Sequence, residues 1–170
     1  MANNKLFRGN IKFGLAFPEA FANWQTPATS ELNGSFYTDV TCALTENGTK
    51  FDLGNSSTDN TLTFCQTAGA QTLTFYNPTI TYEFNDSSSA TANDQANIAF
   101  NLMAFPDIEY FAILRVGKDP ALPFAVGDIV SMVRVGTDWP SDTVGTGKNI
   151  LYTQQFLSHG DLIWRYALAS

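Results

Sequence analysis

Apolar and polar residues alternate along much of the chain, which is the pattern of β-strands with one face in a core. Residues Thr79–Phe84 alternate strictly, and shorter alternating runs surround Phe64 and Phe75. These three segments predict successive half-buried strands.

The last third of the chain is also predicted to be extended. The runs Ile108–Val116 and Ile129–Val135 are apolar on both faces, which favours central strands. Residues Ile150–Leu157 and Leu162–Leu168 alternate again, so each predicts a strand with one face in the core. Residues 158–161, Ser-His-Gly-Asp, stand between them and predict a hairpin turn.

One segment has helical rather than strand spacing. Thr91 followed by Asp94 resembles a capping box, and Pro106 ends the run. The spacing predicts one α-helix over about residues 90–105. Its apolar stripe consists of Ala92, Ala96, Ala99, Leu102 and Met103.

Two long segments lack periodicity. Residues 17–36 are either an extended arm or an ordered loop, and residues 136–149 predict a long loop between two strands. Loops longer than about 12 residues are usually functional or mobile. Trp139 within the second loop therefore suggests an apolar anchor for a contact.

These patterns together predict a mainly β protein. We expect a β-sandwich or a rolled antiparallel sheet of about eight strands, with one α-helix and the long loop. A chain of 170 residues corresponds to a single domain, residues 1–170. Within it, residues 1–36 could extend from the body as an assembly arm.

The charge distribution limits the possible partners. The chain carries 16 acidic and 9 basic side chains, a net charge of −7. Residues 1–12 hold Lys5, Arg8 and Lys12 without an acid, whereas residues 13–114 hold eleven acids and one lysine. Because phosphate binding depends on Lys and Arg, this excess argues against a nucleic-acid-binding protein.

The low total charge is equally informative. Charged residues make up 15% of the chain, whereas about 25% is usual in soluble domains. Much of the polar surface must therefore be Thr, Ser, Asn and Gln, which is easily buried against another copy. No apolar segment has the length of a signal peptide or a membrane span, so we expect no membrane partner.

Few residues point to catalysis. Cys42 and Cys65 lie in runs that resemble strands and are expected to be buried as small hydrophobic residues. His159 is the only histidine, and the expected role of this residue is in the predicted turn. Trp164 alternates with core positions and is expected to be packed, rather than to bind sugar with the other tryptophans.

Neither a phosphate loop nor a metal site is convincing. Residues 145–148, Gly-Thr-Gly-Lys, resemble a phosphate loop, but Asp142 and Asn149 stand where that motif requires Gly and Ser or Thr. Asp107 and Glu109 could hold a cation, but we favour a solvated strand entry as their explanation. We therefore expect no catalytic residues, cofactor or metal, and no enzymatic activity.

The order of these features resembles the tail tube proteins, or major tail proteins, of bacteriophages with long non-contractile tails. The resemblance rests on the size of the chain, the strands before one mid-chain helix, and the loop at 136–149. It also includes the opening residues 4–12, Asn-Lys-Leu-Phe-Arg-Gly-Asn-Ile-Lys, and the closing residues 162–170, Leu-Ile-Trp-Arg-Tyr-Ala-Leu-Ala-Ser.

The resemblance implies a structural virion protein, made in the host cytoplasm, that assembles into stacked homohexameric rings with other tail proteins. DNA would pass through the lumen as cargo without being bound, and acidic side chains would keep it from the wall. A tail terminator could share this body plan. The residues that would contact neighbouring subunits are Lys5, Arg8, Lys12, Trp24, Trp139 and Lys148.

Two alternatives remain open from the sequence. A capsid decoration protein, or another structural protein of the virion, would also be β-rich, low in charge and non-enzymatic. A carbohydrate-binding β-sandwich would use Trp24 or Trp139 to stack on sugar rings.

Overall fold

The computed structural model describes residues 10–44, 58–59, 72–73, 79–84, 95–144 and 150–170. These residues are mainly β, as predicted. The strands are β1 Ile11–Ala16, β2 Tyr37–Asp39, β3 Thr58–Asp59, β4 Thr72–Leu73, β5 Thr79–Phe84, β6 Glu109–Val116, β7 Ile129–Thr137, β8 Ser141–Val144 and β9 Ile150–Ala167. The helices are α1 Thr29–Leu32 and α2 Gln95–Met103, with short 3₁₀ helices η1 Pro18–Ala20 and η2 Thr41–Ala43.

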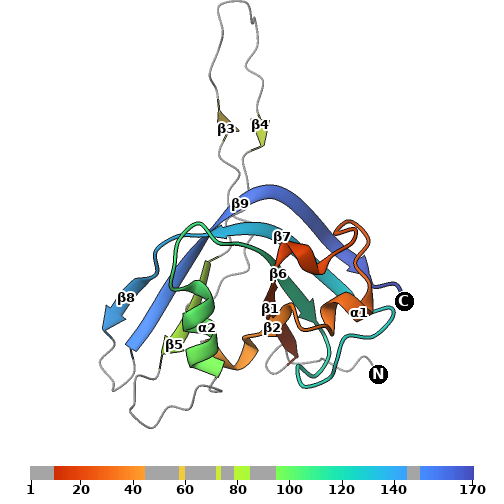
Figure 1. Ribbon diagram of the computed structural model, residues 1–170, viewed down its shortest axis with the longest axis horizontal. Helices are drawn as coiled ribbons and strands as arrows, with labels where there is room; N and C mark the ends of the chain where they lie inside the picture. Colours follow the sequence, from red (N-terminus) through yellow and green to blue (C-terminus); the bar gives the residue numbers. More distant parts are fainter. Residues whose placement is uncertain (1–9, 45–57, 60–71, 74–78, 85–94, 145–149) are drawn as a thin grey trace, which may run out of the picture.

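Seven strands form one antiparallel sheet in the order β2-β1-β6-β7-β9-β5, and β8 also pairs with β9. Strands β3 and β4 pair only with each other. The sheet is strongly curved, and α2 lies inside the curve (Figure 1). Within the described residues the count of about eight strands is not confirmed, and the continuous sheet agrees with a rolled sheet rather than a sandwich.

Strands β6 and β7 lie in the centre of the sheet and are covered on both faces, as their apolar sequences predict. Tyr110 and Ala112 of β6 belong to the cluster that packs against α2. Phe111 and Ile113 alternate with them and belong to the cluster on the opposite face, together with Leu32 of α1. The sheet therefore separates two apolar cores.

Helix α2 lies within the predicted range of residues 90–105. Ala99 and Met103, two members of the predicted apolar stripe, are fully buried in the concave core. The proposed capping residues Thr91 and Asp94 lie outside the described residues.

The predicted hairpin turn at residues 158–161 is wrong, because β9 runs through it as a single strand of 18 residues. Val135 pairs with Ser158 and Val133 with Leu162, so three residues of β9 lie opposite Arg134. Gly160 has a φ of 89° in this bulge. Turns and bulges both use residues that tolerate a positive φ, which explains the wrong prediction.

A second irregularity changes the face on which the end of β9 presents its side chains. Met132 pairs with Ile163 and Val130 with Tyr166, so Trp164 and Arg165 together oppose Ser131. Arg165 has a φ of 55°, and Trp164 is 55% exposed. The prediction that Trp164 is packed is therefore wrong, because the extra residue breaks the alternation.

The loop predicted at residues 136–149 is wrong over most of its described part. Strand β7 continues to Thr137, and β8 then pairs with β9 from Ser141 to Val144. Only residues 138–140 separate the two strands, and Pro140 has no N–H to donate to a ladder. The strands thus form one interrupted partner of β9, while residues 145–149 lie outside the described part.

The segment 17–36 is an ordered loop. It contains η1 and α1, and the strand before it, β1, lies inside the sheet. An extended arm that begins at residue 1 could therefore include no more than residues 1–9, which lie outside the described residues. Cys42 is exposed in η2, which contradicts its predicted burial in a strand. Strand β5 is confirmed, whereas Phe64, Cys65 and Phe75 lie outside the described residues.

Candidate assembly surfaces

The break between β7 and β8 contains an exposed tryptophan whose backbone is held by hydrogen bonds. The side chain of Gln154 is completely buried, and its Nε2 donates to the carbonyl oxygen of Asp138 at 2.8 Å. The backbone N–H of Trp139 in turn donates to Asp138 Oδ1 at 2.7 Å. Trp139 is 67% exposed, so a backbone anchored from inside the protein presents an aromatic ring to solvent.

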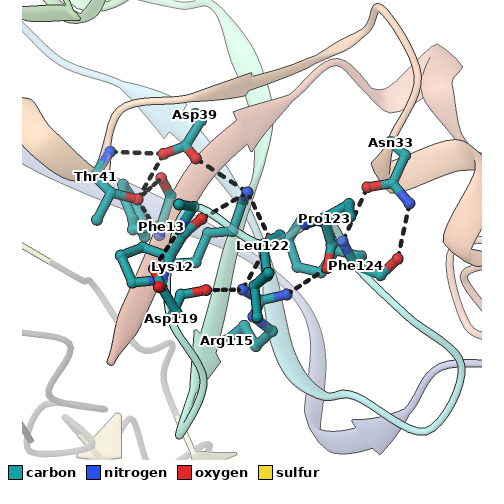
Figure 2. Close-up of polar contacts among 12 residues, drawn as sticks. Lys12, Phe13, Asn33, Asp39, Thr41, Arg115, Asp119, Leu122, Pro123 and Phe124 are labelled. Carbon is teal, nitrogen blue, oxygen red and sulfur yellow. Dashed lines mark hydrogen bonds and ion pairs between the residues drawn. The ribbon is translucent and has the colours of Figure 1, made fainter. Parts of the chain in front are cut away.

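The loop between β6 and β7 is held by a buried arginine. Arg115 is 1% exposed, and its Nη1 donates to the carbonyl of Pro123 at 2.9 Å. Its Nη2 donates to the carbonyls of Asp119 and Leu122 at 2.8 and 3.0 Å. Figure 2 shows how one guanidinium group from β6 gathers these loop carbonyls. The planar donors of Arg suit such a cluster of acceptors.

The charge of Arg115 is compensated by Asp128, which is also buried. Arg115 Nη1 lies 3.0 Å from Asp128 Oδ2, and Lys118 donates to the other carboxylate oxygen. Burial raises the pKa of the Asp128 carboxyl. The hydrogen bonds from Lys118, the Ala125 N–H and Arg115 together lower it by more, so the pKa lies below its usual value. Asp128 therefore remains ionised in its buried position.

A second cation supports the same loop from β1. Lys12 is 8% exposed and forms an ion pair with Asp39 at 3.2 Å. Its ammonium group also donates to the carbonyls of Pro120 and Leu122 at 3.0 and 3.2 Å (Figure 2). The ring of Phe124 lies 5.4 Å from this ammonium and 5.1 Å from the guanidinium of Arg115. Both distances are within cation–π range.

A pocket of 310 Å³ opens between β2, the end of α1 and the β6–β7 loop. Its wall is rigid, since Asn33 bonds both backbone groups of Phe124, at 2.9 and 3.0 Å. The ring of Tyr37 packs edge-on against Phe124 with 5.2 Å between the ring centroids. Burial raises the pKa of the Tyr37 hydroxyl, which keeps it neutral. The residues that line the pocket include Lys12, Leu32, Tyr37, Asp39, Pro123 and Phe124.

Glycine 14 explains how Tyr37 reaches this position. A Cβ atom at residue 14 would lie 2.4 Å from a ring carbon of Tyr37 and from the backbone oxygen of Thr38. The tyrosine ring therefore packs directly on the β1 backbone, as only a glycine permits.

A separate polar cluster crosses three strands. Arg134 of β7 contacts Glu109 of β6 at 2.5 Å and Asp161 of β9 at 3.3 Å, and His159 lies 3.9 Å from Glu109. The hydrogen bond from Arg134 holds the pKa of Glu109 below its usual value. Asp107 lies in a turn with a φ of 62°. Glu109 accepts a hydrogen bond from Arg134 and does not form a site with Asp107. The described residues contain no group of three or more side chains suited to a metal.

The predicted contact residues differ in exposure and in whether the structure describes them. Trp139 is exposed, whereas Trp24 is partly buried and stacks on Phe111 with 5.9 Å between centroids. Lys12 is committed to bonds within the chain, so we no longer include it among the contacts that we propose. Lys5, Arg8 and Lys148 lie outside the described residues.

The sequence reasoning missed Arg115 and Asp128. A signal was present, because a charged residue near the end of a strand that is apolar on both faces needs a buried partner. Asp119 and Asp128 are the nearest acids in the sequence after it. The sequence could therefore have identified the pair, although not the loop carbonyls that complete the arrangement.

The described residues define a class of protein. They form a curved β-sheet protein with several large apolar side chains exposed, and none of the described helices is long and apolar enough to cross a membrane. The chain belongs to the phage tail tube protein family, whose family model matches residues 1–169. No curated protein matches it. It is thus a structural protein of the virion tail, in a family whose members assemble with themselves and other tail proteins.

Proposed function

We propose that this protein is the subunit of the phage tail tube and assembles into stacked hexameric rings. The observation that carries the proposal is the family match over residues 1–169. Two features support it: the sheet ends in β2 on one side and β5 on the other, and several large apolar side chains are exposed. A subunit with contact surfaces in different places can form rings or filaments.

Assembly can be tested on the purified full-length chain. Negative-stain electron microscopy at rising protein concentration should show tubes of constant diameter with a central hole. Closed trimers, or monomers at every concentration, would contradict a tube subunit, and trimers would favour a capsid decoration protein. Short capped stacks would instead favour a tail terminator.

We further propose that the tube lumen is acidic and that DNA passes through it without being bound. Residues 13–114 hold eleven carboxylates against the single cation Lys50, a net charge of −10. Carboxylates repel phosphates over roughly a Debye length of 8–10 Å, so the DNA would slide rather than adhere. A structure of the assembled tube with Lys and Arg as the main lumen residues would contradict this proposal.

The basic N-terminal segment is proposed to contact an adjacent ring. Because β1 begins at Ile11 and Lys12 supports the fold, a truncation that tests this idea should remove residues 2–9 only. We expect a higher protein concentration to be needed for polymerisation. As a control, Lys5→Gln with Arg8→Gln tests the charge alone. Unchanged polymerisation of the truncated chain would exclude a role for this segment.

A further inference from the structure

We propose that Trp139 of one copy inserts into the pocket beside Phe124 of the next copy. This inference rests on the proposed self-assembly and names the two surfaces that meet. The contact is heterologous, because the inserted side chain and the pocket belong to different parts of the fold. Repetition of such a contact builds rings when it closes and filaments when it does not.

Trp139 is suited to be the inserting side chain because its backbone is held in place before contact. Its backbone is held by the Asp138 carboxylate, while buried Gln154 anchors the Asp138 carbonyl. The ring nevertheless remains 67% exposed. Little backbone entropy is then lost on binding, and tryptophan is enriched among residues that dominate interfaces.

The pocket is suited to receive an aromatic ring. Its volume of 310 Å³ is at the lower end of the ~300–1,000 Å³ typical of small-molecule sites, which suits one large side chain. Tyr37, which is partly exposed, and Pro123, which is exposed, offer ring surfaces on which an indole can pack. Hydrogen bonds from Arg115, Lys12 and Asn33 keep the wall in place.

The position of the two surfaces favours contact between copies over contact within one chain. Phe124 precedes β7 and Trp139 follows it, so this nine-residue strand separates them by roughly 30 Å at 3.3 Å per residue. In Figure 1, β8 and α1 lie on opposite sides of the molecule. A copy can therefore offer Trp139 to one neighbour and its pocket to another at the same time.

Two variants remove the two halves of the contact separately. Trp139→Ala removes the inserting ring, and Ala121→Trp fills the pocket from an exposed position on its rim. We expect each to raise the protein concentration needed for assembly by about 30-fold or more, the size of an interface hot spot. The matched controls are Trp164→Ala, which removes another exposed tryptophan, and Ala125→Trp, which alters the same loop away from the pocket; both should assemble like the unaltered chain.

Mixing the two defective variants gives the sharper result. Trp139→Ala retains the pocket and Ala121→Trp retains the ring, so an equal mixture should form one-to-one dimers that cannot elongate. Sedimentation velocity measures this directly. Normal tubes from Trp139→Ala, or a mixture that stays monomeric, would overturn the inference, and the first of these results would leave the proposed tube function intact. Failure of the unaltered chain to form tubes would contradict the proposed function, while dimers in the mixture would still support the contact.

Discussion

Arg115 is a charged residue inside a sheet whose central strands are otherwise apolar. It is tolerated because four oxygen atoms from the β6–β7 loop accept its hydrogen bonds. Removing the guanidinium leaves these carbonyl oxygens without this donor and leaves the buried Asp128 with Lys118 and the Ala125 N–H as its partners. The loop is thus stabilised from within the sheet rather than from its own surface.

Replacement of Arg115 by methionine should lower the free energy of unfolding by about 3 kcal/mol, the size expected when one partner of a buried ion pair is removed. Urea denaturation of the monomer measures the change. Lys118→Met is the matched control, because Lys118 contacts the same carboxylate but is half exposed, and it should cost about 1 kcal/mol or less. Equal effects of the two variants would show that burial of Arg115 is unimportant.

Asp128 should make stability depend on acid. Its pKa is lower in the folded chain than in the unfolded chain, where it is ordinary, so its contribution is present above the unfolded value. This contribution is lost as the pH falls through the folded value. The unaltered chain should therefore lose more stability between about pH 6 and pH 2 than Asp128→Asn does. Glu109→Gln serves as a partly exposed comparison. Equal pH dependence in the unaltered chain and Asp128→Asn would contradict the prediction.

At the scale of elements, the sequence identified strands by their periodicity and failed where that periodicity is interrupted. Strands β6 and β7 and helix α2 were predictable, because each buries residues at its own characteristic spacing. The continuity of β9 was not predictable, since Ser158, His159 and Gly160 suit a turn as well as a bulge. Only the pairing with β7, far away in the sequence, distinguishes the two.

The contact site was predictable to a smaller extent than the fold. Trp139 was identified because an aromatic residue without periodic neighbours is unusual in a loop. The pocket was not, because it combines Lys12, Tyr37 and Phe124 from three distant segments. Cys42 illustrates the same limit, since its exposed side chain lies in a 3₁₀ helix that the local pattern did not reveal.

Gly160 should be required for the bulge in β9. Its φ of 89° is unfavourable for residues with a Cβ, so Gly160→Ala should reduce the free energy of unfolding by about 1 kcal/mol. Gly160→Asn should cost less, because asparagine visits the left-handed region more readily. Thermal unfolding of both variants provides the measurement. An alanine variant as stable as the unaltered chain would show that the bulge does not need this backbone conformation.

For the whole molecule, the net charge of −7 predicts the absence of affinity for DNA outside the tube. Phosphate binding depends on released counterions and is strongest at low salt, so a test at about 20 mM salt favours detection. Electrophoresis should show no retardation of duplex DNA by the full chain, with a basic DNA-binding protein as positive control. A retarded band that disappears with added salt would contradict the prediction.

The continuity of β9 has a mechanical consequence. One part of this strand pairs with β7 and the other part with β5 and β8, so a single backbone joins these two regions of the curved sheet. No loop interrupts β9 between the two regions to act as a hinge. A force that separates the two regions loads the covalent backbone of β9 and shears its hydrogen bonds together. The hydrogen bonds between strands then do not open one after another.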